Sequence, residues 1–309
     1  MTEALKGKFL LAGFQDKIAA FILPGQRIGL PKEGFDAPTT HILKISPPDS
    51  VNAAFNEHLC LFLAAACGCN VPPSGILNFE KEKVFIIERY DRKIINNRLS
   101  RLHQEDLCQL LGLSRDRKYQ RNRNQAPGPG FKEMLEIFQK LEDQNRLNST
   151  LKPWKTELLN LSIFNFAIGN KDAHGKNFSL IYDENFQLNL APAYDLLTMT
   201  PYNLMDQTHT MSYSQSRETG LNVPPSRDDW LNFAQTFSVS SSEICKAIAK
   251  ISETILDNLE NQVEKCCTSN GCEKKTAEIL TKAITKTANR LRKTGLSLSR
   301  NTHWAPQTS

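Results

Sequence analysis

The segment NFAIGNKDAHGKNFSLIY, residues 165–182, changes character twice within a few positions. Its apolar, helix-like start stops at a Gly-Asn pair, and its end has the pattern of a β-strand. Between them lie an acid, an imidazole, an amine and an amide: Asp172, His174, Lys176 and Asn177. Packing seldom explains four such groups in so short a stretch, so the segment predicts a functional site between a helix and a strand.

Asp172 and Asn177 have the spacing D-x-x-x-x-N. In phosphoryl transfer, an Asp accepts the proton of the attacking hydroxyl, and an Asn five residues later helps to hold a magnesium ion. The spacing alone is weak evidence, because Asp and Asn are common residues and such pairs also occur by chance.

Residues 178–195 predict a β-hairpin that ends at Asp195. A kinase fold places its second metal ligand, a carboxylate, at the end of such a hairpin. Magnesium needs few protein ligands when phosphate oxygens and water complete its shell, so Asn177 and Asp195 would suffice. A simple turn or cap role for Asp195 remains the alternative.

Two charged residues upstream fit the same chemistry. Residues 40–46 predict an apolar strand that carries Lys44, and residues 50–68 predict a helix that carries Glu57. A lysine in an apolar strand is costly unless an anion meets it, and ATP phosphates would serve, with Glu57 holding the amine. Solvent-facing positions for both residues remain the alternative.

The turn LAGFQDK, residues 11–17, lies between two predicted strands and supplies Gly13, Gln15 and Lys17. Backbone N–H groups in such a turn can hold phosphates, although the turn lacks the second Gly and the Lys-Ser/Thr pair of a Walker A loop. The segment IIERYD, residues 86–91, would pair its backbone with adenine and stack Tyr90 on the base. A core role for this aromatic ring is equally consistent with the sequence.

The order of these features follows that of a two-lobed kinase. We predict an α+β, protein-kinase-like fold, with a small β-rich N-lobe at residues 1–90 and a larger helical C-lobe at residues 91–309. Within the second lobe, helices are expected at residues 103–112, 131–147 and 156–169. Two amphipathic helices follow, the first of which opens with a capping box from Ser240 to Glu243.

Composition sets wider limits. A hydrophobic content of 40% and a charged content of 23% are ordinary for a globular protein, and the net charge of +5 does not by itself indicate nucleic acid. The longest apolar run, LCLFLAAACGC, is too short to cross a bilayer, and the N-terminus lacks the pattern of a secretory signal. We therefore expect a cytoplasmic protein without membrane association, whose eight cysteines are free thiols.

Residues 114–130, SRDRKYQRNRNQAPGPG, carry five basic residues and one acid without apolar periodicity. A solvated loop and a loop that contacts phosphate or substrate beside an active site both remain open.

Several of these segments together resemble the HipA-like serine/threonine kinases, the toxins of bacterial toxin–antitoxin systems. The segments are LAGFQDK, TTHILK, NEHLCLFLAAACGCNVPPS, ERYDR, RLHQEDLCQLLG, KYQ, GPG, IGNKDAHGKNFSL and LAPAYDLL. The resemblance implies that Asp172 is the catalytic base and that Asn177 and Asp195 hold Mg²⁺. It also implies that Lys44 and Lys17 bind the phosphates of ATP.

By the same resemblance, Glu88 and Tyr90 line the adenine pocket and His174 shapes the catalytic loop. The target would be an aminoacyl-tRNA synthetase, the tryptophanyl or the glutamyl enzyme. The phosphate turn begins almost at the N-terminus, as in HipT, the short form in tripartite systems. That form implies a HipS-like small antitoxin and a HipB-like DNA-binding protein as partners. We expect no direct nucleic-acid binding, because only the basic loop of residues 114–130 would support it.

The turn departs from the family in one respect, because KFLLAGFQDK contains no Ser or Thr that could be autophosphorylated. An ATP-binding pseudokinase that acts as a partner in a repressor complex is the alternative function. The filled positions of all three proposed catalytic and metal-binding residues argue against it.

Overall fold

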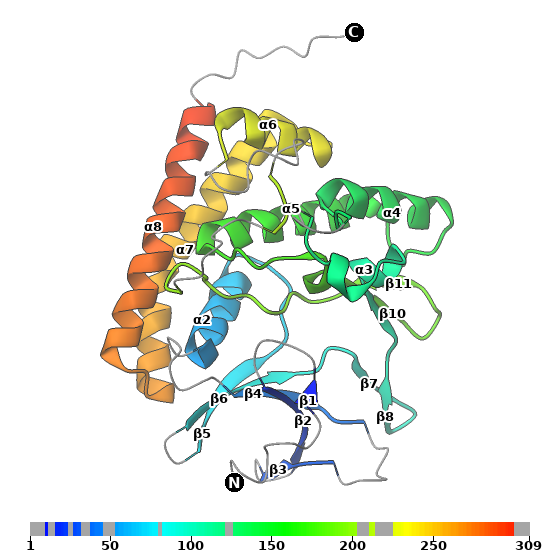
Figure 1. Cartoon of the computed structure of the whole chain (residues 1–309), viewed down its shortest axis with the longest axis vertical. Helices are drawn as coiled ribbons and strands as arrows, with labels where there is room; N and C mark the ends of the chain where they lie inside the picture. The colour runs from blue at the N-terminus through cyan, green and yellow to red at the C-terminus, as the bar shows by residue number, and fades with distance from the viewer. Residues whose placement is uncertain are drawn as a thin grey trace.

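The computed structural model describes residues 10–11, 16–23, 27–31, 38–45, 53–79, 82–120, 126–202, 210–213 and 225–299. Two residues of the predicted phosphate turn, Gly13 and Gln15, lie outside these ranges. In Figure 1 a β-sheet built from the first part of the chain lies below a larger, mainly helical region.

Six antiparallel strands form the main sheet, in the order β1–β2–β4–β6–β5, with β3 paired to β2. They are β1 (Leu10–Leu11), β2 (Asp16–Leu23), β3 (Arg27–Gly29), β4 (His41–Ile45), β5 (Ser74–Phe79) and β6 (Glu82–Glu88). Side chains alternate across the sheet, so Ile18, Leu43 and Val84 form a small apolar cluster on one face. The other face, with Phe85 and Ile87, joins the main core.

Helix α2 (Ala53–Ala66) joins the sheet to the helical region (Figure 1). It is buried along most of its length and packs on β5 and β6 as well as on α7 (Ser241–Asn270). A helix that is covered on nearly all sides is mostly apolar, so the buried charge of Glu57 in α2 is unusual.

The helical region holds one continuous core. Its helices are α3 (Leu107–Leu110), α4 (Phe131–Asp143), α5 (Leu151–Ile168), α6 (Arg227–Thr236), α7 and α8 (Lys274–Ser299). The last two form a long antiparallel pair, and the predicted capping box from Ser240 to Glu243 begins α7. Helix α5 begins five residues earlier than predicted, and from Leu158 onward it is buried nearly all round, as predicted. It ends at Gly169, whose φ of +73° suits a residue without a side chain.

Three sequence-based boundaries were wrong. Strand character continues past residue 91, through β7 (Arg92–Ile95), β8 (Arg98–Arg101) and β9 (Gln104–Asp106). The helix predicted at residues 103–112 is reduced to α3, because β9 pairs with β10 (Ser179–Tyr182). The predicted hairpin consists of β10 and β11 (Leu188–Leu190), so its second strand ends well before Asp195.

Among the described residues, no helix combines the length and apolarity that crossing a bilayer requires.

Candidate active site

Lys44 joins two carboxylates that lie far apart in the sequence. Its Nζ lies 2.6 Å from Glu57 Oε1 and also forms an ion pair with Asp195 Oδ1. Lys44 and Glu57 are almost fully buried, whereas the Asp195 side chain is 27% exposed and remains accessible to a ligand. The fold therefore assembles the predicted strand lysine, helix glutamate and distant aspartate into one group.

The charges in this group are strongly coupled. Burial alone would lower the pKa of Lys44, but the carboxylates of Asp195 and Glu57 outweigh burial and raise it. Burial alone would raise the pKa of Asp195, but Lys44 and Lys17 hold it well below its usual range. For Glu57, burial prevails over Lys44, and the pKa is raised. Lys44 and Asp195 are thus firmly charged at neutral pH.

Lys17 reaches the same carboxylate from the neighbouring strand. It pairs directly with Lys44 in the register between β2 and β4, so both side chains lie on the face that is turned toward the helical region. Its Nζ lies 3.5 Å from Asp195 Oδ2. Two amines on adjacent strands therefore form a cationic pair around an accessible acid.

Asp195 has a left-handed backbone conformation, with φ of +54°. Asp tolerates this region better than most residues, and a residue that is held there is commonly functional. The Asn170 side chain hydrogen-bonds the Asp195 carbonyl at 3.4 Å and Asn165 Oδ1 at 2.8 Å. Asn170 thus ties the end of α5 to the segment that carries Asp195.

Asn170 also orders the loop that carries D-x-x-x-x-N. Its Oδ1 accepts from the Asp172 amide at 3.1 Å, and Asn177 Nδ2 donates to the Asp172 carbonyl at 3.1 Å. A single 3₁₀ turn at Gly175–Asn177 closes the loop. The structure therefore joins Asp172 and Asn177 by a direct hydrogen bond, in addition to their sequence spacing.

Neighbouring side chains set the charge environment of the Asp172 carboxylate. Burial raises the pKa of Asp172, the charge of Lys118 and a hydrogen bond from Tyr119 lower it in part, and Asp195 raises it. Lys118 Nζ lies 2.9 Å from His174 Nε2 and 4.7 Å from the centre of the Tyr119 ring. The carboxylate therefore lies in a partly buried, cation-lined position that suits a general base.

His174 is a structural residue of this loop. Burial and the nearby Lys118 lower its pKa to about 4, so the ring is neutral at pH 7. Because an ammonium group only donates, Nε2 accepts from Lys118 and Nδ1 carries the proton. The role of His174 in shaping the catalytic loop stays a prediction.

The described residues of the basic segment, residues 114–120 and 126–130, lie beside this site. This position is consistent with a loop beside an active site, one of the two interpretations of its sequence. The Gly175 amide donates to the Lys118 carbonyl at 3.0 Å, and the Gly128 amide donates to the Tyr119 carbonyl at 2.9 Å. A Cβ on Gly128 would lie 2.0 Å from the Arg117 carbonyl oxygen. This glycine is therefore required for the close packing that places Lys118 and Tyr119; residues 121–125 lie outside the described ranges.

The predicted adenine-pocket residues lie at the end of β6. Glu88 is exposed, and its amide donates to the Pro73 carbonyl at 2.9 Å. The Tyr90 ring stacks on Tyr194, with ring centres 5.7 Å apart, and its hydroxyl donates to Gln104. One face of the Tyr90 ring is thus covered by the residue next to Asp195.

Asn56 is a further polar residue of this region that the sequence interpretation missed. It is fully buried and clamps α2 to the segment after Asp195, bonding the Thr198 carbonyl at 2.8 Å and the Thr198 amide at 3.0 Å. Asn56 and Asn170 had a sequence signal, because each lies in or directly after an apolar helical run, where a buried amide needs partners. Lys118 and Tyr119 gave no comparable signal.

Asn177 and Asp195 fit a magnesium ion by the chemistry of their oxygens. Asn177 uses its NH₂ group on the Asp172 carbonyl, which leaves Oδ1 as an acceptor, and Asp195 is ionised. The described ranges contain no group of three His, Cys, Asp or Glu residues that could hold a metal. An ion bound here would therefore complete its shell with phosphate oxygens and water, which magnesium favours.

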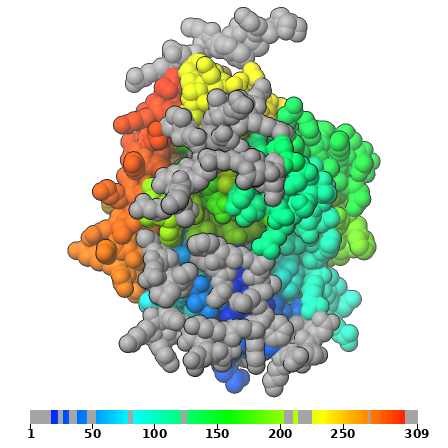
Figure 2. Space-filling view, viewed as in Figure 1, coloured from blue at the N-terminus to red at the C-terminus, as the bar shows by residue number. Residues whose placement is uncertain are grey.

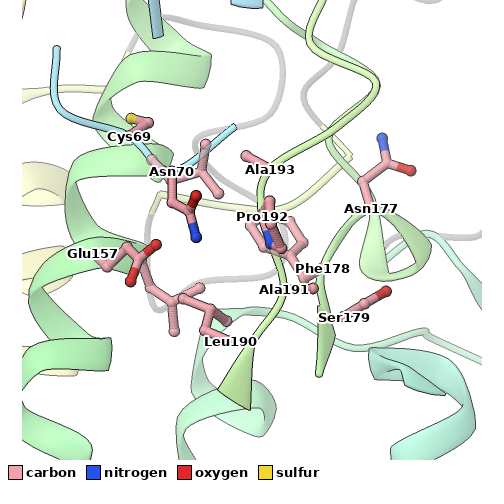
Figure 3. Close-up of a pocket in the computed structure, with 12 residues that line it drawn as sticks. Cys69, Asn70, Glu157, Asn177, Phe178, Ser179, Leu190, Ala191, Pro192 and Ala193 are labelled. Carbon is pink, nitrogen blue, oxygen red and sulfur yellow. The ribbon is translucent and has the colours of Figure 1, made fainter. Parts of the chain in front are cut away.

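The face seen in Figure 2 is recessed at its centre, where green atoms of the helical region show above the blue sheet region. A separate small cavity lies behind the loop, lined by Asn70, Glu157, Phe178 and Pro192 among others, and Figure 3 shows the Asn177 side chain pointing away from it. Its volume of about 10 Å³ holds one water molecule at most. This cavity is too small for a substrate.

The sequence profile of the HipA-like C-terminal domain matches residues 9–259. The chain belongs to this family. A Sinorhizobium fredii protein named "Putative kinase Y4mE" is 32% identical over 255 residues, which cover 82% of this chain and 57% of that protein. The serine/threonine-protein kinase toxin HipA of Shewanella oneidensis is 29% identical over 216 residues, or 67% of this chain and 47% of the toxin. The chain spans about half the length of the curated relatives it matches.

Solved structures confirm the predicted two-lobed kinase-like fold. A chain of the Shewanella oneidensis complex of HipA, HipB and operator DNA matches with a TM-score of 0.75 and 22% identity, over 93% of this chain and 68% of that chain. The Helicobacter pylori proinflammatory kinase CtkA matches with a TM-score of 0.60 and 12% identity, over 96% of both chains. At these identities the likeness concerns the fold.

Proposed function

We propose that this HipA-like protein is a serine/threonine protein kinase that uses ATP and Mg²⁺. The observation that carries the proposal is the convergence of Lys44, Glu57 and Asp195 beside a loop in which a hydrogen bond joins Asp172 and Asn177. These residues come from a sheet, a helix and two loops, and their combination is what phosphoryl transfer requires. The kinase names of the relatives support the same activity.

In the proposed reaction, Asp172 accepts the proton of a Ser or Thr hydroxyl. The hydroxyl oxygen forms a bond to the γ-phosphorus as the bond to ADP breaks. Burial raises the pKa of Asp172 toward the working pH, which improves a general base. Asn177 stabilises the loop that carries Asp172, through its hydrogen bond to the Asp172 carbonyl.

Lys44 and Lys17 provide the positive charge for the phosphate groups. Both amines contact Asp195 in the structure, so the pair is already held at the required place by a carboxylate. Glu57 keeps Lys44 oriented through a 2.6 Å contact. A magnesium ion held by Asn177 and Asp195 would neutralise phosphate charge. Gly13 and Gln15, as part of the phosphate turn, and Glu88 and Tyr90, at the adenine, complete the proposed nucleotide site.

For the biological setting, we propose a toxin whose target is an aminoacyl-tRNA synthetase, as the resemblance in the sequence implies. A HipB-like DNA-binding protein is the proposed partner, which the solved complex of HipA with HipB and operator DNA supports for that relative. A HipS-like small protein is the second proposed partner, on the resemblance to the HipT form alone.

Two substitutions separate the proposed roles. Asp172→Asn should keep the affinity for magnesium-ATP and abolish transfer of labelled phosphate to proteins of a bacterial lysate. Asp195→Asn should weaken magnesium-ATP binding as well, as measured by calorimetry. Asp228→Asn is the matched control, because that side chain is 85% exposed on α6, and it should change neither quantity. Transfer at the wild-type rate by Asp172→Asn would exclude this assignment.

A further inference from the structure

A row of basic side chains runs along the exposed face of α8. Lys282, Lys286 and Arg290 recur every four residues and are all exposed, whereas Ile284 and Leu291 on the opposite face are fully buried. Residues four apart lie on the same side of a helix, so these three residues, called the basic row here, form one line about 12 Å long.

The second half of the basic row lies where α8 packs against the last turn of α5. Thr287, between two members of the row, donates its hydroxyl to the Ala167 carbonyl in the last turn of α5 at 2.6 Å. The chain leaves α5 there and reaches Lys171, the residue directly before Asp172. Burial lowers the pKa of Lys171, and the charges of Arg290 and Lys286 lower it further. Lys286, Arg290 and Lys171 are therefore close enough to form one cationic surface, and Lys171 directly precedes the proposed base in the sequence.

The cations of α8 gather without balancing acids. The helix carries seven Lys or Arg residues and a single acid, Glu278, whereas α7 carries five acids and three basic residues. Within the described part of the chain, no salt bridge joins a member of the basic row. Like charges four residues apart on a helix repel one another, so this arrangement opposes folding slightly and favours an anionic ligand.

We propose that the basic row and Lys171 bind an acidic segment of the polypeptide substrate next to its phosphoacceptor residue. This inference rests on the proposed kinase function. The position favours a substrate, because the row lies beside Lys171, the residue directly before Asp172, whereas the nucleotide lysines Lys17 and Lys44 lie on the sheet. A polypeptide fits better than a single-stranded nucleic acid, which proteins hold with aromatic stacking platforms, since α8 contains no aromatic residue.

The test compares two triple variants with the same change of charge. The first reverses the basic row: Lys282→Glu, Lys286→Glu and Arg290→Glu. The control reverses three exposed lysines at the opposite end of the α7–α8 pair: Lys265→Glu, Lys274→Glu and Lys275→Glu. Lys275 is about 10 Å from Lys282, the nearest member of the basic row, along the helix axis, which exceeds the screening length of about 8 Å in physiological salt.

The probes are a fluorescein-labelled peptide with one Ser flanked by Glu residues and the same peptide with Gln in place of Glu. Fluorescence anisotropy should show that the row variant binds the acidic peptide at least about tenfold more weakly than wild type, whereas the control variant changes little. Binding of the Gln peptide should be the same in all three proteins. The preference for the acidic peptide in kcat/KM of phosphate transfer should also disappear in the row variant.

Failure of this inference differs from failure of the proposed function. If wild type transfers phosphate but the row variant keeps its preference for the acidic peptide, the docking surface is wrong and the kinase stands. If wild type transfers no phosphate but peptide binding still depends on the row, the docking surface is supported and the proposed kinase function is wrong. Tighter binding of a single-stranded RNA than of the acidic peptide, lost in the row variant, would overturn the polypeptide assignment.

Discussion

Removing Lys44 should destabilise the protein far more than removing its partner Glu57. In Lys44→Met, the buried Glu57 carboxylate loses the cation that lies 2.6 Å away. Breaking a buried ion pair so that one charge stays uncompensated costs about 3–5 kcal/mol. In Glu57→Gln, an amide oxygen can still accept from Lys44, and the burial penalty of a carboxylate disappears. Glu57 Oε2 has no hydrogen-bond partner within the described residues, so this second change should cost only about 1 kcal/mol.

Urea unfolding of both variants, followed by circular dichroism, measures this difference. The double variant should recover most of the loss of Lys44→Met, because neither buried charge remains. The loss should also depend on pH. Burial already raises the pKa of Glu57 in the folded protein, and removing Lys44 raises it further. Because the pKa of Glu57 is higher in the folded than in the unfolded state, its contribution to stability is fully present below the unfolded value of about 4.3 and is lost as pH rises. The free energy of unfolding of Lys44→Met should therefore be lower at pH 7.5 than at pH 5. Equal losses in the two single variants, or a loss independent of pH, would refute the reasoning.

Three further changes test separate parts of the structure. Asn56→Ala should lower the free energy of unfolding by about 1–3 kcal/mol, because the Thr198 amide and carbonyl lose their partners, and an unchanged urea midpoint would contradict the clamp. Burial lowers the pKa of His58 to about 4, so below about pH 6.5 the unfolded chain takes up a proton that the folded protein does not, and the folded protein loses stability. In urea unfolding at pH 7 and pH 5, the free energy of unfolding of wild type should therefore fall by about 2 kcal/mol more than that of His58→Gln. Gly128→Ala should reduce both stability, by about 1–3 kcal/mol, and phosphate transfer, since its Cβ would overlap the Arg117 carbonyl, and normal activity would show that this packing is not needed.

The two-lobed fold was predictable because local patterns and the order of features agreed. Apolar alternation marked β2, β4 and β6, and the all-apolar run marked α5. The boundaries of β9 and α3 were not predictable, because residues 104–106 become a strand only through pairing with β10, which lies more than 70 residues later. A contact of that range leaves no periodic pattern in the segment itself.

The candidate site shows the same division. The structure brings Lys44, Glu57 and Asp195 into one group, as their predicted positions required. Lys118 and Tyr119 were not predicted to surround Asp172, because a basic, non-periodic segment gives no information about what it packs against. Their placement depends on tertiary packing, in which the Gly128 amide bonds the Tyr119 carbonyl. The roles of these residues in catalysis stay predictions.

The most direct test of the kinase assignment is to incubate the protein with magnesium-ATP and a bacterial lysate, beside an Asp172→Asn control, and to map new phosphorylation sites by mass spectrometry. The proposed function predicts a phosphoserine or phosphothreonine on an aminoacyl-tRNA synthetase that is absent from the control. The same sites in both samples, or no new site although calorimetry shows that ATP binds, would contradict it.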